Sequence, residues 1–134
     1  MPDPITSDSA FRVAMLALNG LAKRQEIIGR NLANIDTPGY QAQALNFEST
    51  LRQAMNEPDK VSLQVTNPGH LPATQQEGSF QIASRQGGSW RADGNNVDID
   101  VELNQMAETG LRYQALTQLV SKKLLLLKAI ANSR

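Results

Sequence analysis

The stretch NLANIDTPGY, residues 31–40, closes a long apolar repeat with several helix-stopping signals in a row. Pro38 disfavours helical geometry at Thr37, so a helix that runs into this stretch must end before it. Pro38 and Gly39 suit the two central positions of a type II turn, in which Gly39 supplies a positive φ. We therefore expect a helix end followed at once by a tight turn.

Polar residues on either side of this turn suit a helix end. Asn34 tolerates a left-handed cap conformation, and Asp36 or Thr37 can bond the backbone groups that the last helical turn leaves free. Tyr40 adds a flat amphipathic side chain directly after the turn. Taken alone, these residues are explained by an ordinary helix stop.

The segment before the stop predicts an amphipathic helix from about Asp8 to Ile35. Its apolar residues follow alternate steps of three and four, which is the spacing of a heptad seam. The seam consists of Phe11, Ala14, Leu18, Leu21, Ile28, Leu32 and Ile35.

A second helix is predicted from about Asp100 to Ala131, with acidic residues near its start and lysines near its end, as the helix dipole favours. Its seam consists of Leu103, Met106, Gly110, Tyr113, Thr117, Val120, Leu124, Leu127 and Ala131. A further stripe beside the seam consists of Ala107, Leu111, Leu119 and Leu126. An apolar face this wide needs more than one partner helix, or burial in an assembly.

Residues 41–96 are rich in Gln, Asn, Gly, Pro and Ser and predict an irregular, β-containing insertion. Asn46 is expected to cap a short helix that uses Phe47, Leu51 and Met55. Strict alternation predicts a strand at residues 61–66, and residues 80–82 form a weaker strand signal. The expected fold is mainly α. Residues 1–40 and 97–134 pair in a coiled-coil-like way as one helical domain, and 41–96 are inserted between them.

The complete motif around the turn resembles the signature of bacterial flagellar rod and hook proteins. In that family an Asn-rich helix end, here Asn31 and Asn34, leads into a segment like Thr37-Pro38-Gly39-Tyr40, near the same position in the chain. The segment GNNVDIDVELNQMAETGLRYQALTQLVSKKLLLLKAI, residues 94–130, resembles the C-terminal part of a proximal rod protein. VTNPGHLP, residues 65–72, is similar to a middle segment of the same kind of protein.

This resemblance implies a structural subunit of the basal-body rod, the drive shaft that transmits torque across the periplasm and encloses an export channel. Its implied partners are copies of itself, other rod proteins, and the membrane-embedded MS ring or export gate at the rod base. Export would proceed through the flagellar type III apparatus, without a cleaved signal peptide. The resemblance makes residues 31, 34 and 36–40 the signature turn. The expected assembly faces are the helix seams together with Leu111 and Leu119 of the further stripe.

Composition and motifs argue against catalysis, cofactors and nucleic-acid binding. The chain has 13 basic and 13 acidic residues and no cysteine, so bulk electrostatic attraction to nucleic acid and thiolate chemistry are not expected. His70 is the only histidine, and we expect it to pack or hydrogen-bond in a loop. DGNNVDID does not match a calcium loop, because its glycine comes second and Asn104 stands where the bidentate Glu belongs. Its acids suit a turn and a helix cap. We predict no enzyme, metal site, cofactor or small-molecule substrate.

Two other interpretations account for the helices. The chain could be an autonomous helical hairpin that serves as an adaptor or scaffold, since heptad seams are typical of helices that pair with each other. Residues 119–131, with Lys122, Lys123 and Lys128, could instead lie on a membrane surface, although these lysines also complement a helix C-terminus. Within the rod family, close paralogues of the proximal rod protein are a further alternative.

Overall fold

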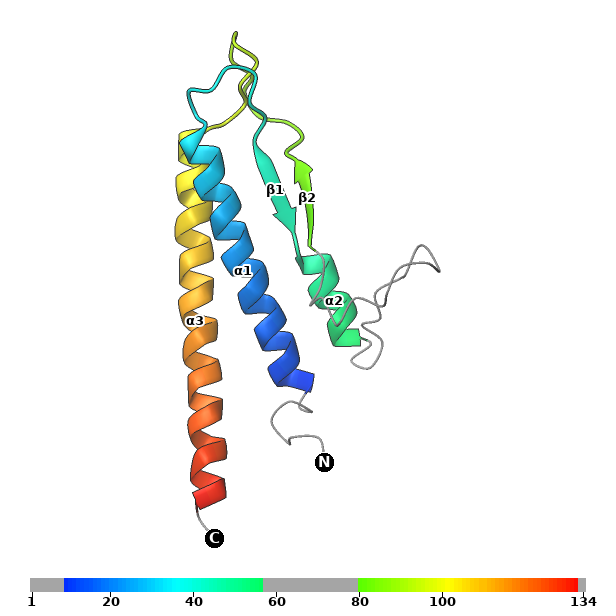
Figure 1. Cartoon of the computed structure of the whole chain (residues 1–134), viewed down its shortest axis with the longest axis vertical. Coiled ribbons are helices and arrows are strands. Elements are labelled where there is room, and N and C mark those ends of the chain that lie inside the picture. The colour runs from blue at the N-terminus through cyan, green and yellow to red at the C-terminus, as the bar shows by residue number, and fades with distance from the viewer. Residues whose placement is uncertain (1–8, 57–79, 133–134) are drawn as a thin grey trace, which may run out of the picture.

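The computed structural model describes residues 9–56 and 80–132. Along the chain they form α1 (Ser9–Ala33), β1 (Gln43–Asn46), α2 (Glu48–Asn56), β2 (Gln81–Ser84) and α3 (Ile99–Asn132). Figure 1 shows α1 and α3 side by side along the length of an elongated molecule, with the strands and α2 on the other side of α1. The mainly helical fold with long terminal helices and a small β-containing insertion is confirmed.

The two long helices lie close together where α1 ends and α3 begins, and they separate toward the first residue of α1 (Figure 1). With 34 residues against 25, α3 is longer than α1 by about 13 Å at ~1.5 Å per residue. The last turns of α3 therefore extend past the first residue of α1 (Figure 1). Coiled-coil-like pairing stays a prediction.

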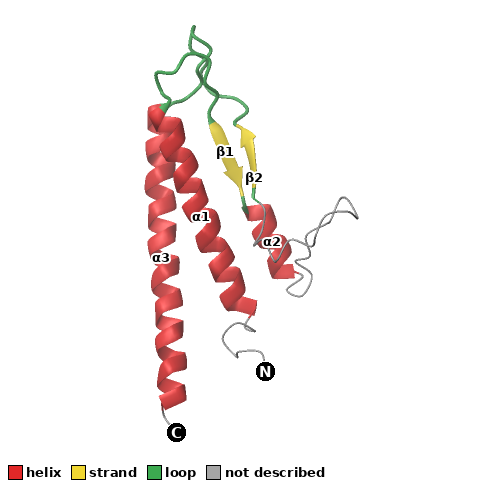
Figure 2. Ribbon diagram, in the orientation of Figure 1, coloured by secondary structure: helices red, strands yellow, loops and turns green. Residues whose placement is uncertain are grey.

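The strands form a two-stranded antiparallel sheet, in which Gln43 pairs with Ser84 and Asn46 with Gln81 (Figure 2). The weak strand signal at residues 80–82 is confirmed as β2, shifted by one residue at its start. β1 was not predicted, because QALN shows no clear alternation. The strand predicted at residues 61–66 and the loop around His70 lie outside the described residues.

The short helix α2 was predicted, but its cap was not Asn46. Asn46 is the last residue of β1, and the backbone N–H of Leu51 donates to the carbonyl of Phe47 at 2.9 Å. Phe47 is therefore the cap position. Since the helix begins later, its inner face carries Leu51 and the buried Ala54, while Met55 points outward.

The core lies between α1, the sheet and the middle of α3. Four buried residues form its centre, namely Leu21, Ile27, Leu45 and Phe47, and Leu51, Phe80 and Leu116 pack against them. Phe47 meets Phe80 edge to face, with ring centroids 6.1 Å apart. Arg24 stacks over the Phe47 ring and donates to the carbonyl of Leu45. This core holds the sheet against α1.

Candidate functional site

The turn after α1 has the predicted geometry. Gly39 has a φ of +73°, and the N–H of Tyr40 donates to the carbonyl of Thr37 at 3.2 Å. These are the marks of a type II turn with Pro38 and Gly39 at its centre. A Cβ at position 39 would meet nothing within 4 Å. Glycine is therefore required there by the backbone conformation rather than by space.

The helix end differs from the prediction in how it is capped. No described residue other than glycine has a positive φ, so Asn34 does not adopt a left-handed cap. Its side-chain amide instead donates to the carbonyl of Arg30 at 2.8 Å, while the last turn tightens through bonds from Asn34 to Asn31 and from Ile35 to Leu32. The short i→i−3 bonds use carbonyls that an α-helix would leave free at its end.

The carbonyls that leave the helix are bound by the side chain of Asn95 and by Thr37, whose backbone N–H donates to the carbonyl of Asn34 at 3.1 Å. The fully buried amide nitrogen of Asn95 lies within hydrogen-bond distance of the carbonyls of Asn34, Ile35 and Thr37, at 3.0, 3.0 and 2.9 Å. The side-chain oxygen of Asn95 accepts the N–H of Val97 at 2.7 Å. One residue thus joins the turn after α1 to the approach to α3.

Residues 91–95 reinforce this contact with backbone bonds. The N–H of Gly39 donates to the carbonyl of Asp93 at 2.8 Å, and Arg91 and Asn95 close a turn of their own. Asp93 accepts the N–H of Asn95, which confirms the expected turn role of this acid. Gly94 has a φ of +80°, and a Cβ there would lie 3.5 Å from the Cα of Gly39. The two turns are therefore closely packed.

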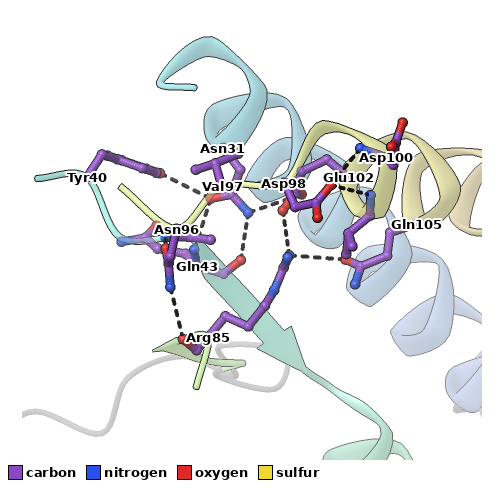
Figure 3. Close-up of polar contacts among 12 residues, drawn as sticks. Asn31, Tyr40, Gln43, Arg85, Asn96, Val97, Asp98, Asp100, Glu102 and Gln105 are labelled. Carbon is purple, nitrogen blue, oxygen red and sulfur yellow. Dashed lines mark hydrogen bonds and ion pairs between the residues drawn. The ribbon is translucent and has the colours of Figure 1, made fainter. Parts of the chain in front are cut away.

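Asn31 is the second centre of the site and uses all of its hydrogen-bonding capacity. Its amide nitrogen donates to the carbonyl of Gln43 at 2.8 Å and to Glu102 at 3.2 Å. Its oxygen accepts the Tyr40 hydroxyl at 3.1 Å and the N–H of Gln43 at 2.9 Å. Figure 3 shows these side chains converging from α1, β1 and α3. Asn31 is fully buried, and a buried amide needs such complete pairing.

Glu102 brings a charge into this cluster. It is fully buried and forms an ion pair with Arg85 at 2.6 Å (Figure 3), and Arg85 also donates to Gln105. Removing one partner of a buried pair leaves an uncompensated charge and is strongly destabilising. Asn96 completes the connection by accepting the N–H of Ala42 at 2.6 Å. We call Asn31, Arg85, Asn95, Asn96 and Glu102 the polar cluster.

Tyr40 is tied to the polar cluster electrostatically as well. Burial raises the pKa of its phenol above the ordinary value of 10.0; the charge of Arg30 opposes this rise, and the charge of Glu102 adds to it. The neutral phenol is the form that donates to Asn31. Tyr40 is thus part of the turn's support rather than a free surface anchor.

Asn31 and Tyr40 were predicted from the sequence as members of the site, whereas the other members of the polar cluster, Arg85, Asn95, Asn96 and Glu102, were not. The acids near the start of the second helix were assigned to capping, and Asp98 does cap α3, accepting the N–H groups of Asp100 and Val101. Nothing in the sequence pattern marks Glu102 as the buried acid.

The predicted assembly faces divide into three groups by burial. Leu21 and Ile28 are buried in the core. Phe11, Leu18, Leu32, Met106, Val120 and Leu127 are partly buried. Leu103, Leu111, Tyr113, Leu119 and Leu124 are exposed.

The side of α3 that faces the rest of the chain is therefore not centred on the predicted seam. Its two buried residues are Glu102 and Thr109, each one position before the seam members Leu103 and Gly110. The buried charge pair of Glu102 turns the helix so that Leu103 points outward, with 49% of its surface exposed. A rule based on apolar spacing cannot anticipate a seam that begins with a buried carboxylate.

Within residues 9–56 and 80–132, no group of three or more His, Cys, Asp or Glu side chains is arranged to hold a metal ion. In the same residues no helix is long and apolar enough to span a bilayer. The geometry of the site is that of a structural junction between two helices.

Comparison with known proteins points to one family. Residues 11–41, which include α1 and the turn, match the family model of flagella basal body rod proteins. Proteins called flagellar basal body rod protein FlgB from Yersinia enterocolitica and Salmonella typhimurium are each 40% identical over 112 residues. The matches cover 80% of this chain, and 82% and 81% of the two relatives. The FlgB protein of Bacillus subtilis is 32% identical over 85% of this chain and 86% of its own.

The chain belongs to the FlgB family of flagellar basal body rod proteins. It is a structural subunit of the proximal rod, and its place is the flagellar basal body. Within this FlgB-family chain, the polar cluster links the matched segment 11–41 to the start of α3.

Proposed function

We propose that this FlgB-family subunit assembles through its long helices, while the polar cluster fixes the directions in which those helices leave the junction. The observation that carries the proposal is the surface of α3. Its buried residues among those described are two polar ones, Glu102 and Thr109, whereas large apolar side chains are exposed along most of its length. The exposed set includes Leu111, Leu119, Leu124, Leu125, Leu126 and Ile130.

Such a surface supports assembly rather than an autonomous hairpin. Contiguous exposed apolar area on a soluble protein marks an interaction surface, and burying one leucine is worth roughly 1.5–3 kcal/mol. A hairpin adaptor would place these leucines against α1, but α1 and α3 separate in this direction (Figure 1). We infer that neighbouring rod subunits bury these exposed leucines.

The distribution of charge opposes a membrane-surface role for residues 119–131. At ~100° per residue, Lys122, Lys123 and Lys128 point in three different directions around α3. A helix that lies in a membrane surface needs one polar face and one apolar face. Here leucines stand between the lysines on every side, which fits contacts with several protein neighbours better.

The exposed faces of α3 bind other copies of this chain and other rod proteins. At the base of the rod, the subunits contact the MS ring or the export gate. The assembled helices form the tubular shaft that transmits torque and encloses the export channel across the periplasm. The subunits reach it through the type III export apparatus. No part of this role calls for catalysis, and we assign none.

Substitution at Leu119 tests the proposal. Leu119→Glu places a carboxylate on the exposed stripe of α3, where desolvation on assembly would be unfavourable. We expect the free chain to stay soluble and to be exported, and incorporation into basal bodies to be lost. Gln118→Glu, at the neighbouring exposed polar position, is the control and should incorporate normally. Purified basal bodies probed for the subunit give the readout. Normal incorporation of Leu119→Glu would remove α3 from the assembly surface.

A further inference from the structure

Each end of α3 carries an exposed apolar patch with one charged residue beside it. The charge is negative at the start of the helix and positive toward its end. At the start, Ile99 and Leu103, one helical turn apart, are both 49% exposed, and the exposed Asp100 lies beside them. Toward the end, Leu119, Leu125 and Leu126 are 65, 65 and 66% exposed around Lys122. We call these the Asp100 patch and the Lys122 patch.

Helical spacing places each charge on the same face as its leucines. Leu103 is three residues after Asp100, while Leu119 and Leu126 are three before and four after Lys122. Residues at these spacings are neighbours on a helix surface. Each patch therefore presents an apolar contact with a single charge inside it, negative in one case and positive in the other.

The charge of α3 is divided along its length. Asp98, Asp100, Glu102 and Glu108 all precede residue 109, and no acidic residue follows in α3. Glu102 and Glu108 are paired with Arg85 and Arg112. Neither Asp100 nor Lys122 forms an ion pair within the described parts of the chain. The two unpaired charges are thus free to meet partners from outside.

We propose that the Asp100 patch of one subunit docks on the Lys122 patch of a second copy of this chain, head to tail. The inference rests on the proposed function and adds to it the identity of the partner and the register of contact. Within one chain the two patches are 22 residues apart on one helix, or about 33 Å, so they cannot pair with each other. A contact between two different patches of identical chains is heterologous, and it can be repeated from copy to copy.

Charge reversal with mixing tests this contact in the full-length chain. We expect Asp100→Lys and Lys122→Glu each to weaken self-association about three- to tenfold at low salt, as sedimentation measures it, because each brings like charges together. Mixing the two variants should restore association to near the parental value, since every contact then joins opposite charges. High salt should reduce all of these differences.

Lys128→Glu is the matched control. It makes the same change of charge as Lys122→Glu in the same part of α3, but on a different face of the helix. It should associate like the parent. Circular dichroism of Asp100→Lys shows whether the first turn of α3 is intact, and restoration by mixing shows it independently. Failure of mixing to restore association, an equal effect of Lys128→Glu, or absence of self-association in the parent would each overturn the proposal.

Basal-body incorporation separates this contact from the proposed function. If both charge variants self-associate like the parent but fail to incorporate, the partner of these patches is a different rod protein and the second-copy assignment is wrong. The two charge variants could also match the parent in self-association and in incorporation while Leu119→Glu still blocks incorporation. That result would support assembly through α3 and rule out the head-to-tail contact.

Discussion

Asn95 connects the segment that leaves α1 to the segment that enters α3. The amide nitrogen of Asn95 shares its two N–H donors among three carbonyls of the segment that leaves α1, and its oxygen accepts one N–H of the segment that enters α3. Buried polar groups left without partners each cost about 1–3 kcal/mol. The two helices are therefore held at one angle by a residue that lies outside both.

Asn95→Asp keeps the shape of the side chain and removes its donors. The carboxylate would face three carbonyl oxygens in a buried site, and we expect a loss of about 2–4 kcal/mol in the free energy of unfolding. Urea unfolding followed by circular dichroism measures this loss. Asn46→Asp, an exposed asparagine at the end of β1, should change stability by less than about 0.5 kcal/mol. Equal stability of the two variants would contradict the role given to Asn95.

Tyr40 supplies a prediction about pH. Because burial raises its pKa above 10.0 in the folded chain, the neutral phenol favours folding below that value. This contribution is lost as pH rises from 10.0 through the folded-state pKa. The chain has two tyrosines, so Tyr113→Phe leaves Tyr40 alone to titrate. Its phenolate absorbance should rise at higher pH in the folded chain than in denaturant. Coincident titration curves would show that Tyr40 is not buried against Asn31.

At the scale of elements, the contact between α1 and the sheet depends on a glycine inside the helix. A Cβ at Gly20 would lie 2.6 Å from the Phe47 ring, whereas a Cβ at Gly29 would meet nothing within 4 Å. Glycine in a helix interior is less favourable than alanine by about 0.5–1 kcal/mol. Gly20 is therefore retained for close packing, and Gly29 is not required by packing within the chain.

Alanine at these two positions should give opposite results. Gly20→Ala should destabilise the chain by about 1–3 kcal/mol through displacement of Phe47, while Gly29→Ala should stabilise it by up to about 1 kcal/mol. Thermal unfolding of both variants under the same conditions makes the comparison. A stabilised Gly20→Ala would mean that Phe47 is not packed against α1.

The sequence predicted those elements whose signals are local. Heptad spacing located both long helices to within two residues, and Pro38-Gly39 located the turn. The polar cluster was missed because each bond in it joins residues distant in the chain, as between Asn31 and Glu102 or between Asn95 and Ile35. The role of Gly20 was missed for the same reason, since a helix glycine shows no sign of its partner. β1 was missed because QALN shows no alternation, and the bonds that Asn31 and Arg24 of α1 make to its backbone join residues distant in the chain.

At the scale of the whole molecule, the chain combines a well-packed junction with a helix that is covered along only part of its length. The polar cluster and the core hold α1, the sheet and the first turns of α3 together. Beyond Leu116, the large apolar residues of α3 are exposed or only partly buried. Helical segments without packing are marginally stable in water. In our account the exposed part of α3 gains its packing from neighbouring rod subunits.

Cysteine accessibility at Leu119 tests this account most directly. The parent chain has no cysteine, so Leu119→Cys introduces a single reactive thiol on the exposed stripe. Ser89→Cys, at an exposed position of the loop before α3, shows that the reagent reaches the subunit. We expect a maleimide to label Leu119→Cys rapidly in the free chain and at least about tenfold more slowly in intact basal bodies, because a buried thiol is shielded from reagent. Equal labelling rates in the free chain and in basal bodies would contradict assembly through α3.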